Sequence, residues 1–216
     1  MGNIRNNVTE LIGRTPVMRV NNIEKELGLS ARVLVKFEAM NPGGSAKDRP
    51  ALNMINDAEN SGRLKPGGTI IEPTSGNTGV GLAMIAASRG YKAVMVMPET
   101  MSIERRKLLN AYGAEIVLTE GAKGMAGSIE KAKELLKETP NSIIADQFSN
   151  EANYRAHMMS TGPELWEDTD GEIDFFVAGV GTGGTLTGVG KYLKDKNSDI
   201  KVIAVEPADS PLLSEG

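Results

Sequence analysis

The 216-residue sequence contains no cysteine and a single histidine, His157. Without cysteine the chain has no disulfide bond, no thiolate metal ligand and no cysteine nucleophile. A lone histidine argues against a clustered metal site and against a catalytic triad. We therefore expect no metal ion, and a packing or surface role for His157.

Long apolar runs and a surplus of positive charge are also absent. No uninterrupted run approaches the ~20 residues that a membrane-spanning helix needs, and the first residues lack the apolar core of a secretory signal. The formal net charge of −4 offers no basic surface for nucleic acid or an anionic membrane. We expect a cytoplasmic globular protein that binds neither nucleic acid nor membrane.

What the sequence does contain is a regular alternation of short apolar strands with helices. This alternation predicts an α/β fold with largely parallel sheets. The polar residues 150–154 look like a connection between two domains. The predicted strands are residues 17–20, 32–37, 69–72, 94–97, 115–119, 143–144, 174–178 and 202–205, and the clearest helices are residues 48–60, 80–88 and 124–137.

Three loops rich in small residues each follow a predicted strand, at residues 41–49, 73–79 and 179–185. In parallel sheets, ligands bind beyond the carboxyl ends of the strands. The position of all three loops at such ends is the main indication of function that the residues give.

The first loop brings Lys47 to the start of a helix. The positive end of a helix dipole disfavours a protonated amine there, which suits a lysine that acts as a nucleophile. Taken alone, Lys47 is more simply a solvated surface lysine, because lysines are mostly exposed. The other loops decide between these interpretations.

The third loop matches G-x-G-x-x-G from Gly179 to Gly184, with Glu206 roughly 20 residues further on, as in dinucleotide-binding folds. One interpretation is therefore a nicotinamide-dependent oxidoreductase. The hydroxyls of Thr182 and Thr185 suit a terminal phosphate monoester better than a pyrophosphate. A glycine-rich turn needed only for packing is a third alternative.

The second loop offers hydroxyl and amide groups where a helix begins, a surface that suits a small carboxylate. The simpler alternative is an ordinary helix cap by Ser75 or Asn77. A phosphate loop, a carboxylate loop and a placed lysine together suggest pyridoxal phosphate bound to Lys47 and acting on an amino acid.

Several longer motifs in this order resemble the cysteine synthase (O-acetylserine sulfhydrylase) family, pyridoxal-phosphate-dependent enzymes of the tryptophan-synthase-β fold type. The stretches SIERRKLL (102–109) and GAKGM (121–125) look more like cysteine synthase than like its relative cystathionine β-synthase. The other matching stretches are NPGGSAKDR (41–49), PTSGNTG (73–79), MPETMS (97–102), TGPE (161–164) and GVGTGGTLTG (179–188).

The resemblance implies an α/β fold of two domains, each with a largely parallel sheet flanked by helices, and the cofactor in the cleft between them. A large cofactor-phosphate domain would comprise residues 1–45 and 151–216, and a small substrate-carboxylate domain residues 46–150. Family members usually continue well beyond Leu213, in a region that supplies a group to the pyridine nitrogen. We therefore expect a C-terminal part of the large domain beyond the 216 residues.

The resemblance also assigns roles to individual residues. Lys47 would carry the internal aldimine of pyridoxal 5'-phosphate and move protons at the substrate α-carbon, and Asn77 would bind the cofactor's 3′ oxygen. The cofactor phosphate would lie against Gly181, Thr182, Gly183, Gly184 and Thr185, and the substrate carboxylate against Thr74, Ser75, Gly76, Thr78 and Gln147.

The implied reaction is a β-replacement in cysteine biosynthesis. Acetate leaves O-acetyl-L-serine by β-elimination, an aminoacrylate intermediate forms, and sulfide adds to give L-cysteine. The family is normally homodimeric, and some members bind the C-terminal tail of serine acetyltransferase. The alternatives are a cystathionine β-synthase-like enzyme, an enzyme that uses O-phosphoserine, and a non-catalytic partner-binding protein on the same fold.

Overall fold

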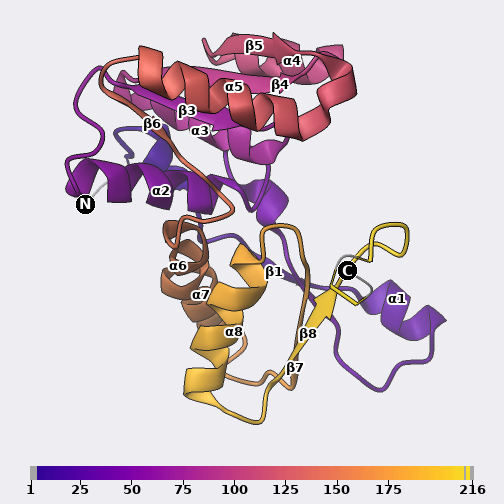
Figure 1. Ribbon diagram of the computed structural model, residues 1–216. Helices are drawn as coiled ribbons and strands as arrows, with labels where there is room; N and C mark the ends of the chain where they lie inside the picture. Colours follow the sequence, from indigo (N-terminus) through magenta and orange to yellow (C-terminus); the bar gives the residue numbers. More distant parts are fainter. Residues whose placement is uncertain (1–3, 212, 215–216) are drawn as a thin grey trace. The chain divides into compact units, whose positions relative to one another are not determined.

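The computed structural model describes residues 4–211 and 213–214 (Figure 1). By their internal contacts they form two compact units. Unit 1 comprises Met1–Ile12 and Lys47–Asn153, and unit 2 comprises Gly13–Ala46 and Tyr154–Gly216. The predicted domains, with their boundaries at residues 45 and 151 and the first residues in the large domain, stay a prediction, as does the cofactor cleft between them.

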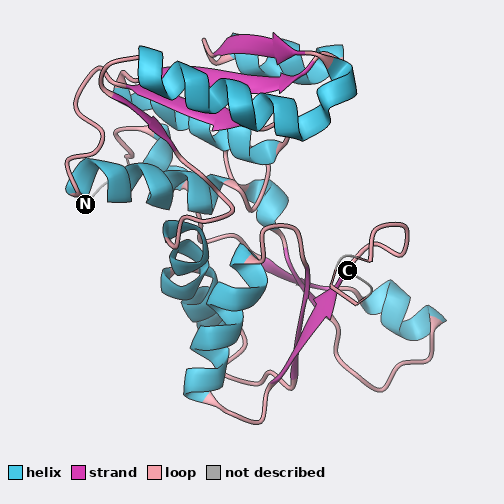
Figure 2. Ribbon diagram, viewed as in Figure 1, coloured by secondary structure: helices cyan, strands magenta, loops and turns pink. Residues whose placement is uncertain are grey.

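Unit 1 is built on a four-stranded sheet in which every paired strand is parallel (Figure 2). Its spatial order is β5-β4-β3-β6. The parallel arrangement agrees with the prediction from the alternating pattern. The strands are β3 (Thr69–Pro73), β4 (Lys92–Pro98), β5 (Glu115–Thr119) and β6 (Ser142–Ile144).

Successive side chains of the central strands enter two different cores, one on each face of this sheet. On β3, Ile70 joins a core with α3 (Asn77–Arg89), whereas Ile71 packs with Ala132 of α5 (Gly124–Glu138). Figure 1 shows α5 and α3 on opposite sides of the sheet. Helix α4 (Ile103–Ala111) packs on the α3 side, and α2 (Asp48–Asn60) lies against α3. Short 3-10 helices, η1 (Val8–Leu11) and η3 (Gly121–Lys123), complete the unit.

Unit 2 contains two pairs of strands. Strands β7 (Phe175–Gly179) and β8 (Lys201–Val205) are parallel, whereas β1 (Val17–Arg19) and β2 (Leu34–Lys36) are antiparallel. The helices are α1 (Asn21–Glu26), η2 (Glu38–Met40), the part of α6 (Ala152–Met159) after Asn153, α7 (Thr161–Asp168) and α8 (Gly184–Lys196). Leu165, Val189, Leu193 and Ile200 form its buried core between α7, α8 and the start of β8.

The outer face of the β7–β8 pair is apolar and open. Phe175 and Val177 on β7 are each 55% exposed, and Ile203 and Val205 on β8 are 40% and 49% exposed. The register aligns Val177 with Ile203, so these side chains share one face. Parallel sheets are usually covered on both faces; α8 packs against both strands of this one, whereas these four side chains remain exposed.

No helix formed by residues 4–211 and 213–214 is both long enough and apolar enough to cross a membrane.

Candidate active site

Lys47 occupies the N-cap position of α2 and already has helical backbone angles, φ −72° and ψ −14°. It is half-buried rather than solvated. Burial lowers the pKa of its ammonium group, which increases the fraction of neutral, nucleophilic amine. The direction agrees with the sequence argument, but the cause is desolvation, where the sequence suggested the helix dipole.

Helix α3 fixes the position of the Lys47 turn by close packing. A Cβ atom on Gly81 would lie 3.0 Å from Ala51 Cβ, 3.3 Å from the Lys47 carbonyl oxygen and 3.4 Å from Asp48 Cα. Gly81 lies one helical turn after Asn77, the first residue of α3. The lysine turn and the second loop therefore belong to neighbouring helix N-termini.

The second loop leads directly into α3, which begins three residues earlier than the predicted Val80. Its N-cap residue, Gly76, has an extended backbone and no side-chain capping bond, so the ordinary cap by Ser75 or Asn77 is not formed. Instead the Gly76 N–H donates to Thr74 Oγ1 at 3.2 Å. An uncapped helix start of this kind can receive a carboxylate.

Asn77 is exposed, and its Oδ1 accepts a hydrogen bond from Arg105 Nη1 at 2.8 Å. Arg105 belongs to α4, which is capped by the Ser102 hydroxyl. Because Arg105 uses the amide oxygen of Asn77, the amide NH₂ is the end oriented to donate to another oxygen. This arrangement fits the predicted role at the cofactor's 3′ oxygen.

The structure joins Thr78 and Gln147, which are 69 residues apart in the sequence. The Thr78 hydroxyl donates to Gln147 Oε1 at 2.6 Å, and both residues are buried. The Asn153 side-chain amide donates to the Gln147 carbonyl oxygen at 2.7 Å. Gln147 is thus held beside the start of α3, as the carboxylate assignment requires.

Glu72, at the end of β3, was not among the predicted site residues. It is 1% exposed and accepts backbone N–H groups from Asp146 at 2.9 Å and from Gln147 at 3.3 Å. Burial, with a smaller contribution from the Asp146 carboxylate, raises the pKa of Glu72 to about 7. The signal in the sequence was an acid inside an otherwise apolar strand.

The third loop lies in unit 2 between β7 and α8. Gly183 has φ +78°, a left-handed conformation that glycine adopts readily, and α8 begins without a side-chain capping bond. Nothing lies within 4 Å of the position that a Cβ on Gly181 would occupy. The backbone at Gly181 is therefore open, just before the uncapped start of α8.

His157 is fully buried beneath this loop and is the second functional candidate that the sequence did not reveal. Its Nε2 is hydrogen-bonded to Thr185 Oγ1 at 3.2 Å and its Nδ1 to Thr161 Oγ1 at 2.9 Å. The expectation of a packing role fits its burial. What the sequence could not show is that His157 contacts the loop through Thr185.

These donor sets fit pyridoxal phosphate. An uncapped helix start with glycines and threonine hydroxyls suits its phosphate, and a half-buried amine of lowered pKa suits its aldehyde. Glu206, which a dinucleotide site needs for a ribose, instead accepts the N–H groups of Leu213 at 2.8 Å and Ser214 at 3.1 Å. Among residues 4–211 and 213–214, no three His, Asp or Glu side chains are arranged to hold a metal ion.

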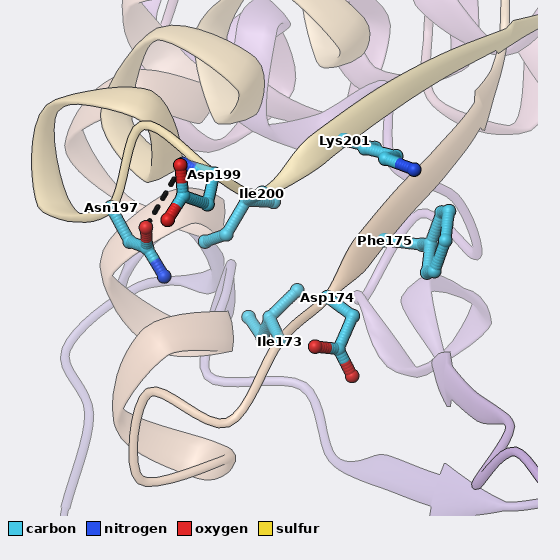
Figure 3. Close-up of a pocket in the computed structure, with 7 residues that line it drawn as sticks. All are labelled: Ile173, Asp174, Phe175, Asn197, Asp199, Ile200 and Lys201. Atoms are coloured by element: carbon cyan, nitrogen blue, oxygen red, sulfur yellow. Dashed lines mark hydrogen bonds between the residues drawn. The ribbon is translucent and has the colours of Figure 1, made fainter.

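A small cavity of about 240 Å³ lies elsewhere in unit 2 (Figure 3). Asp174 and Phe175 border it at the start of β7, and Lys201 borders it at the start of β8. These are the amino ends of the two strands, whereas the glycine loop follows the carboxyl end of β7. The cavity is therefore separate from the predicted phosphate site.

The predicted residues thus divide between the units. Unit 1 holds the lysine and the carboxylate group of residues, and unit 2 holds the phosphate loop. Within unit 1, direct contacts join Thr74 to Gly76 and Thr78 to Gln147. Each predicted role stays a prediction that these positions support.

Comparisons with known proteins place the chain in one family. Residues 8–216 match the family described as "Pyridoxal-phosphate dependent enzyme". A cysteine synthase of Staphylococcus aureus is 56% identical over 211 residues, which are 97% of this chain and 67% of the relative. The chain thus spans about two thirds of the length of that relative.

Solved structures of related enzymes have the same fold as this chain. A hydrogen sulfide-producing enzyme from Fusobacterium nucleatum superposes with a TM-score of 0.95 at 47% identity, over all of this chain and 70% of that one. A cysteine synthase from Entamoeba histolytica superposes with a TM-score of 0.94 at 46% identity, over 99% and 64%.

Proposed function

The chain belongs to the cysteine synthase family of pyridoxal-phosphate-dependent enzymes, and we propose that it forms L-cysteine from O-acetyl-L-serine and sulfide by β-replacement. The observation that carries this proposal is the packing of Gly81 against Lys47. It puts the backbone of Lys47, a half-buried residue, about one helical turn from an uncapped helix start that suits a carboxylate. An α-amino acid carries its amino and carboxylate groups on the same carbon, so the lysine and the carboxylate site must lie close together.

When bound, pyridoxal phosphate supplies an electron sink for the electrons that a proton leaves behind at the substrate α-carbon. Lys47 holds the cofactor and takes the α-proton as acetate departs from the β-carbon. It returns the proton to the α-carbon after sulfide has added to the β-carbon. The lowered pKa of Lys47 suits both steps, because the amine must be neutral to accept a proton near neutral pH.

The other residues bind and orient. The N–H groups at the start of α3, with the hydroxyls of Thr74, Ser75 and Thr78, receive the substrate carboxylate, and Gln147 completes that site. At Gly76 the chain enters α3 in an extended conformation. In unit 2, the backbone of Gly181, Gly183 and Gly184 holds the phosphate, with the hydroxyls of Thr182 and Thr185. Asn77, oriented by Arg105, donates to the cofactor's 3′ oxygen.

Further parts of the proposal concern the whole protein. We place it in the cytoplasm as a homodimer, with the C-terminal tail of a serine acetyltransferase as a protein partner. A peptide that ends in a free carboxylate would enter the same loop as the substrate carboxylate. Size-exclusion chromatography with light scattering tests the dimer, and peptide titration tests the partner.

Visible absorption tests the central proposal. Protein reconstituted with pyridoxal phosphate should show the absorption band of lysine-bound cofactor and should make cysteine from O-acetylserine and sulfide. Lys47→Ala should lose both, whereas Lys65→Ala, which removes an exposed lysine, should keep both. A reconstituted protein without the band would disprove the proposal.

The donor is tested by supplying O-acetylserine, O-phosphoserine and serine in turn and measuring cysteine. Faster turnover with O-phosphoserine would replace O-acetylserine in the proposal. A protein that binds a carboxylate-ended peptide but turns over no donor would be a partner-binding protein on this fold. The likeness to a hydrogen sulfide-producing enzyme favours one further assay, sulfide release from cysteine.

A further inference from the structure

We propose that Glu72 is a positioning residue for the substrate-carboxylate site, because its side chain holds the backbone turn that presents Gln147 to the start of α3. The inference rests on the proposed function, in which Gln147 helps to bind the carboxylate. It assigns Glu72 no contact with the substrate, and all of the residues that carry it belong to unit 1.

Both carboxyl oxygens of Glu72 are used on the same turn. Oε2 accepts the N–H of Asp146 and Oε1 accepts the N–H of Gln147. These two groups come directly after Ala145, at the point where the chain has left β6. The Glu72 side chain thus accepts two backbone N–H groups that have no strand partner, because β6 has already ended.

The turn itself needs such support. Asp146 has φ +54°, a conformation that non-glycine residues adopt rarely and at a cost. The Asn153 amide ties the Gln147 carbonyl from the far side. Gln147 is therefore fixed at its N–H, at its carbonyl and, through Thr78, at its side chain.

Packing alone does not explain an acid at this position. Its neighbours Ile70 and Ile71 are fully buried in the two cores of the sheet, and a buried charge costs free energy unless it is compensated. A carboxylate compensates by accepting two N–H groups at once. Glutamine has a single acceptor oxygen and would place an NH₂ against one of those donors.

Asp146 is the charged neighbour that acts on Glu72, and its carboxylate disfavours the ionised form. The two N–H groups favour that form. A proton on Glu72 would convert one acceptor into a donor and release one side of the turn. Substrate affinity should therefore fall as the pH is lowered through about 7.

The first test compares Glu72→Gln, Gln147→Ala and the double variant in cofactor-loaded protein. Glu72→Gln should raise the KM for O-acetylserine about tenfold, the loss expected for one hydrogen bond to a charged group, and leave kcat within about twofold. In the Gln147→Ala background the same change should alter KM less than about twofold. Equal effects in both backgrounds, or an unchanged KM in Glu72→Gln, would overturn the proposal.

The second test needs no turnover. In protein without cofactor, the amide hydrogens of Asp146 and Gln147 should exchange about tenfold faster in Glu72→Gln than in the unaltered chain. Unchanged exchange would also overturn the proposal. If the amides respond but the unaltered protein makes no cysteine, the proposed function fails and the hold of Glu72 on the turn stands.

Unit 2 provides a matched control. Glu24 is also a buried carboxylate, 7% exposed, that accepts a backbone N–H, from Val33 at 2.6 Å. Glu24→Gln should lower stability but leave the KM for O-acetylserine and the Gln147 amide exchange unchanged. A rise in KM in Glu24→Gln equal to that in Glu72→Gln would show a general loss of stability and would contradict a positioning role.

Discussion

The hydrogen atom that serves Gly81 as a side chain lies against the backbone of Lys47. A Cβ at Gly81 would lie 3.3 Å from the Lys47 carbonyl oxygen and 3.0 Å from Ala51 Cβ. Helices α2 and α3 meet here so closely that a second Cβ would require its neighbours to shift by a few tenths of an ångström. This contact fixes where the lysine turn lies relative to the start of α3.

Gly81→Ala should therefore disturb the lysine turn, and Ala51→Gly should relieve it. Overpacking should cost about 1–3 kcal/mol of folding free energy and lower kcat. Because one glycine and one alanine are merely exchanged, helix propensity nearly cancels in the double variant. Urea unfolding of the four proteins should give a favourable coupling of about 1 kcal/mol. Additive effects would show that the contact is not the cause.

Gly188→Ala should disrupt the helix that carries the third loop. A Cβ there would lie 2.1 Å from the Tyr154 carbonyl oxygen and 2.8 Å from His157 Cβ, so α8 would have to move away from α6. We expect a loss of more than about 3 kcal/mol of stability and weaker binding of pyridoxal phosphate.

Gly190→Ala is the matched control on the same helix. Its nearest neighbour would be Val202 Cγ1 at 3.2 Å, a side-chain atom that can yield by a small shift. It should fold and bind pyridoxal phosphate nearly as the unaltered protein does, as thermal unfolding and cofactor titration would show. Equal damage from both substitutions would count against the α6–α8 contact.

His157→Phe should remove hydrogen bonds that hold the third loop without leaving a cavity in the core. Phenylalanine fills the buried volume but cannot bond to Thr161 or Thr185, so stability should fall by about 1–3 kcal/mol. The dissociation constant for pyridoxal phosphate should rise, since the Thr185 hydroxyl is no longer oriented. His157→Gln, which retains a polar end, should recover part of the affinity. No change in affinity in the Phe variant would refute a link to the loop.

Glu72 should make folding stability depend on pH in an unusual direction for an acid. Its pKa is raised from 4.5 to about 7 on folding, so its contribution is fully present below about pH 4.5 and is lost as the pH rises through about 7. The stability of the unaltered protein relative to Glu72→Gln should therefore fall across that window by up to roughly 3 kcal/mol, because burial disfavours the ionised carboxylate even though that form accepts both N–H groups. Urea unfolding at several pH values measures it.

Glu24 should give folding stability the opposite pH dependence. The hydrogen bonds from Arg19 and Val33 lower its pKa, so its contribution is present at neutral pH and is lost as the pH falls through the folded pKa. The difference between the unaltered protein and Glu24→Gln should therefore grow with rising pH. The same slope for both variants would contradict the assignment at Glu72.

Local pattern predicted most of the secondary structure. Helix α2 spans the predicted residues 48–60, and β5 the predicted residues 115–119, because each carries its own periodicity and its own end signals. Helix α1 was missed, and the start of α3 was predicted too late. At Asn77–Gly79 the helix begins among small polar residues that also suit a loop, and the burial of Thr78 and Gly79 against the core decides the outcome.

The sequence by itself determined the family, the lysine and the three loops, because these are contiguous motifs whose chemistry can be read along the chain. Only the tertiary structure decided what surrounds them. The contact of Gly81 with Lys47, the hold of Glu72 on Gln147 and the link from His157 to Thr185 each join residues 28 or more positions apart. Such pairs meet only after the strands are aligned and the helices packed, so no local pattern predicts them.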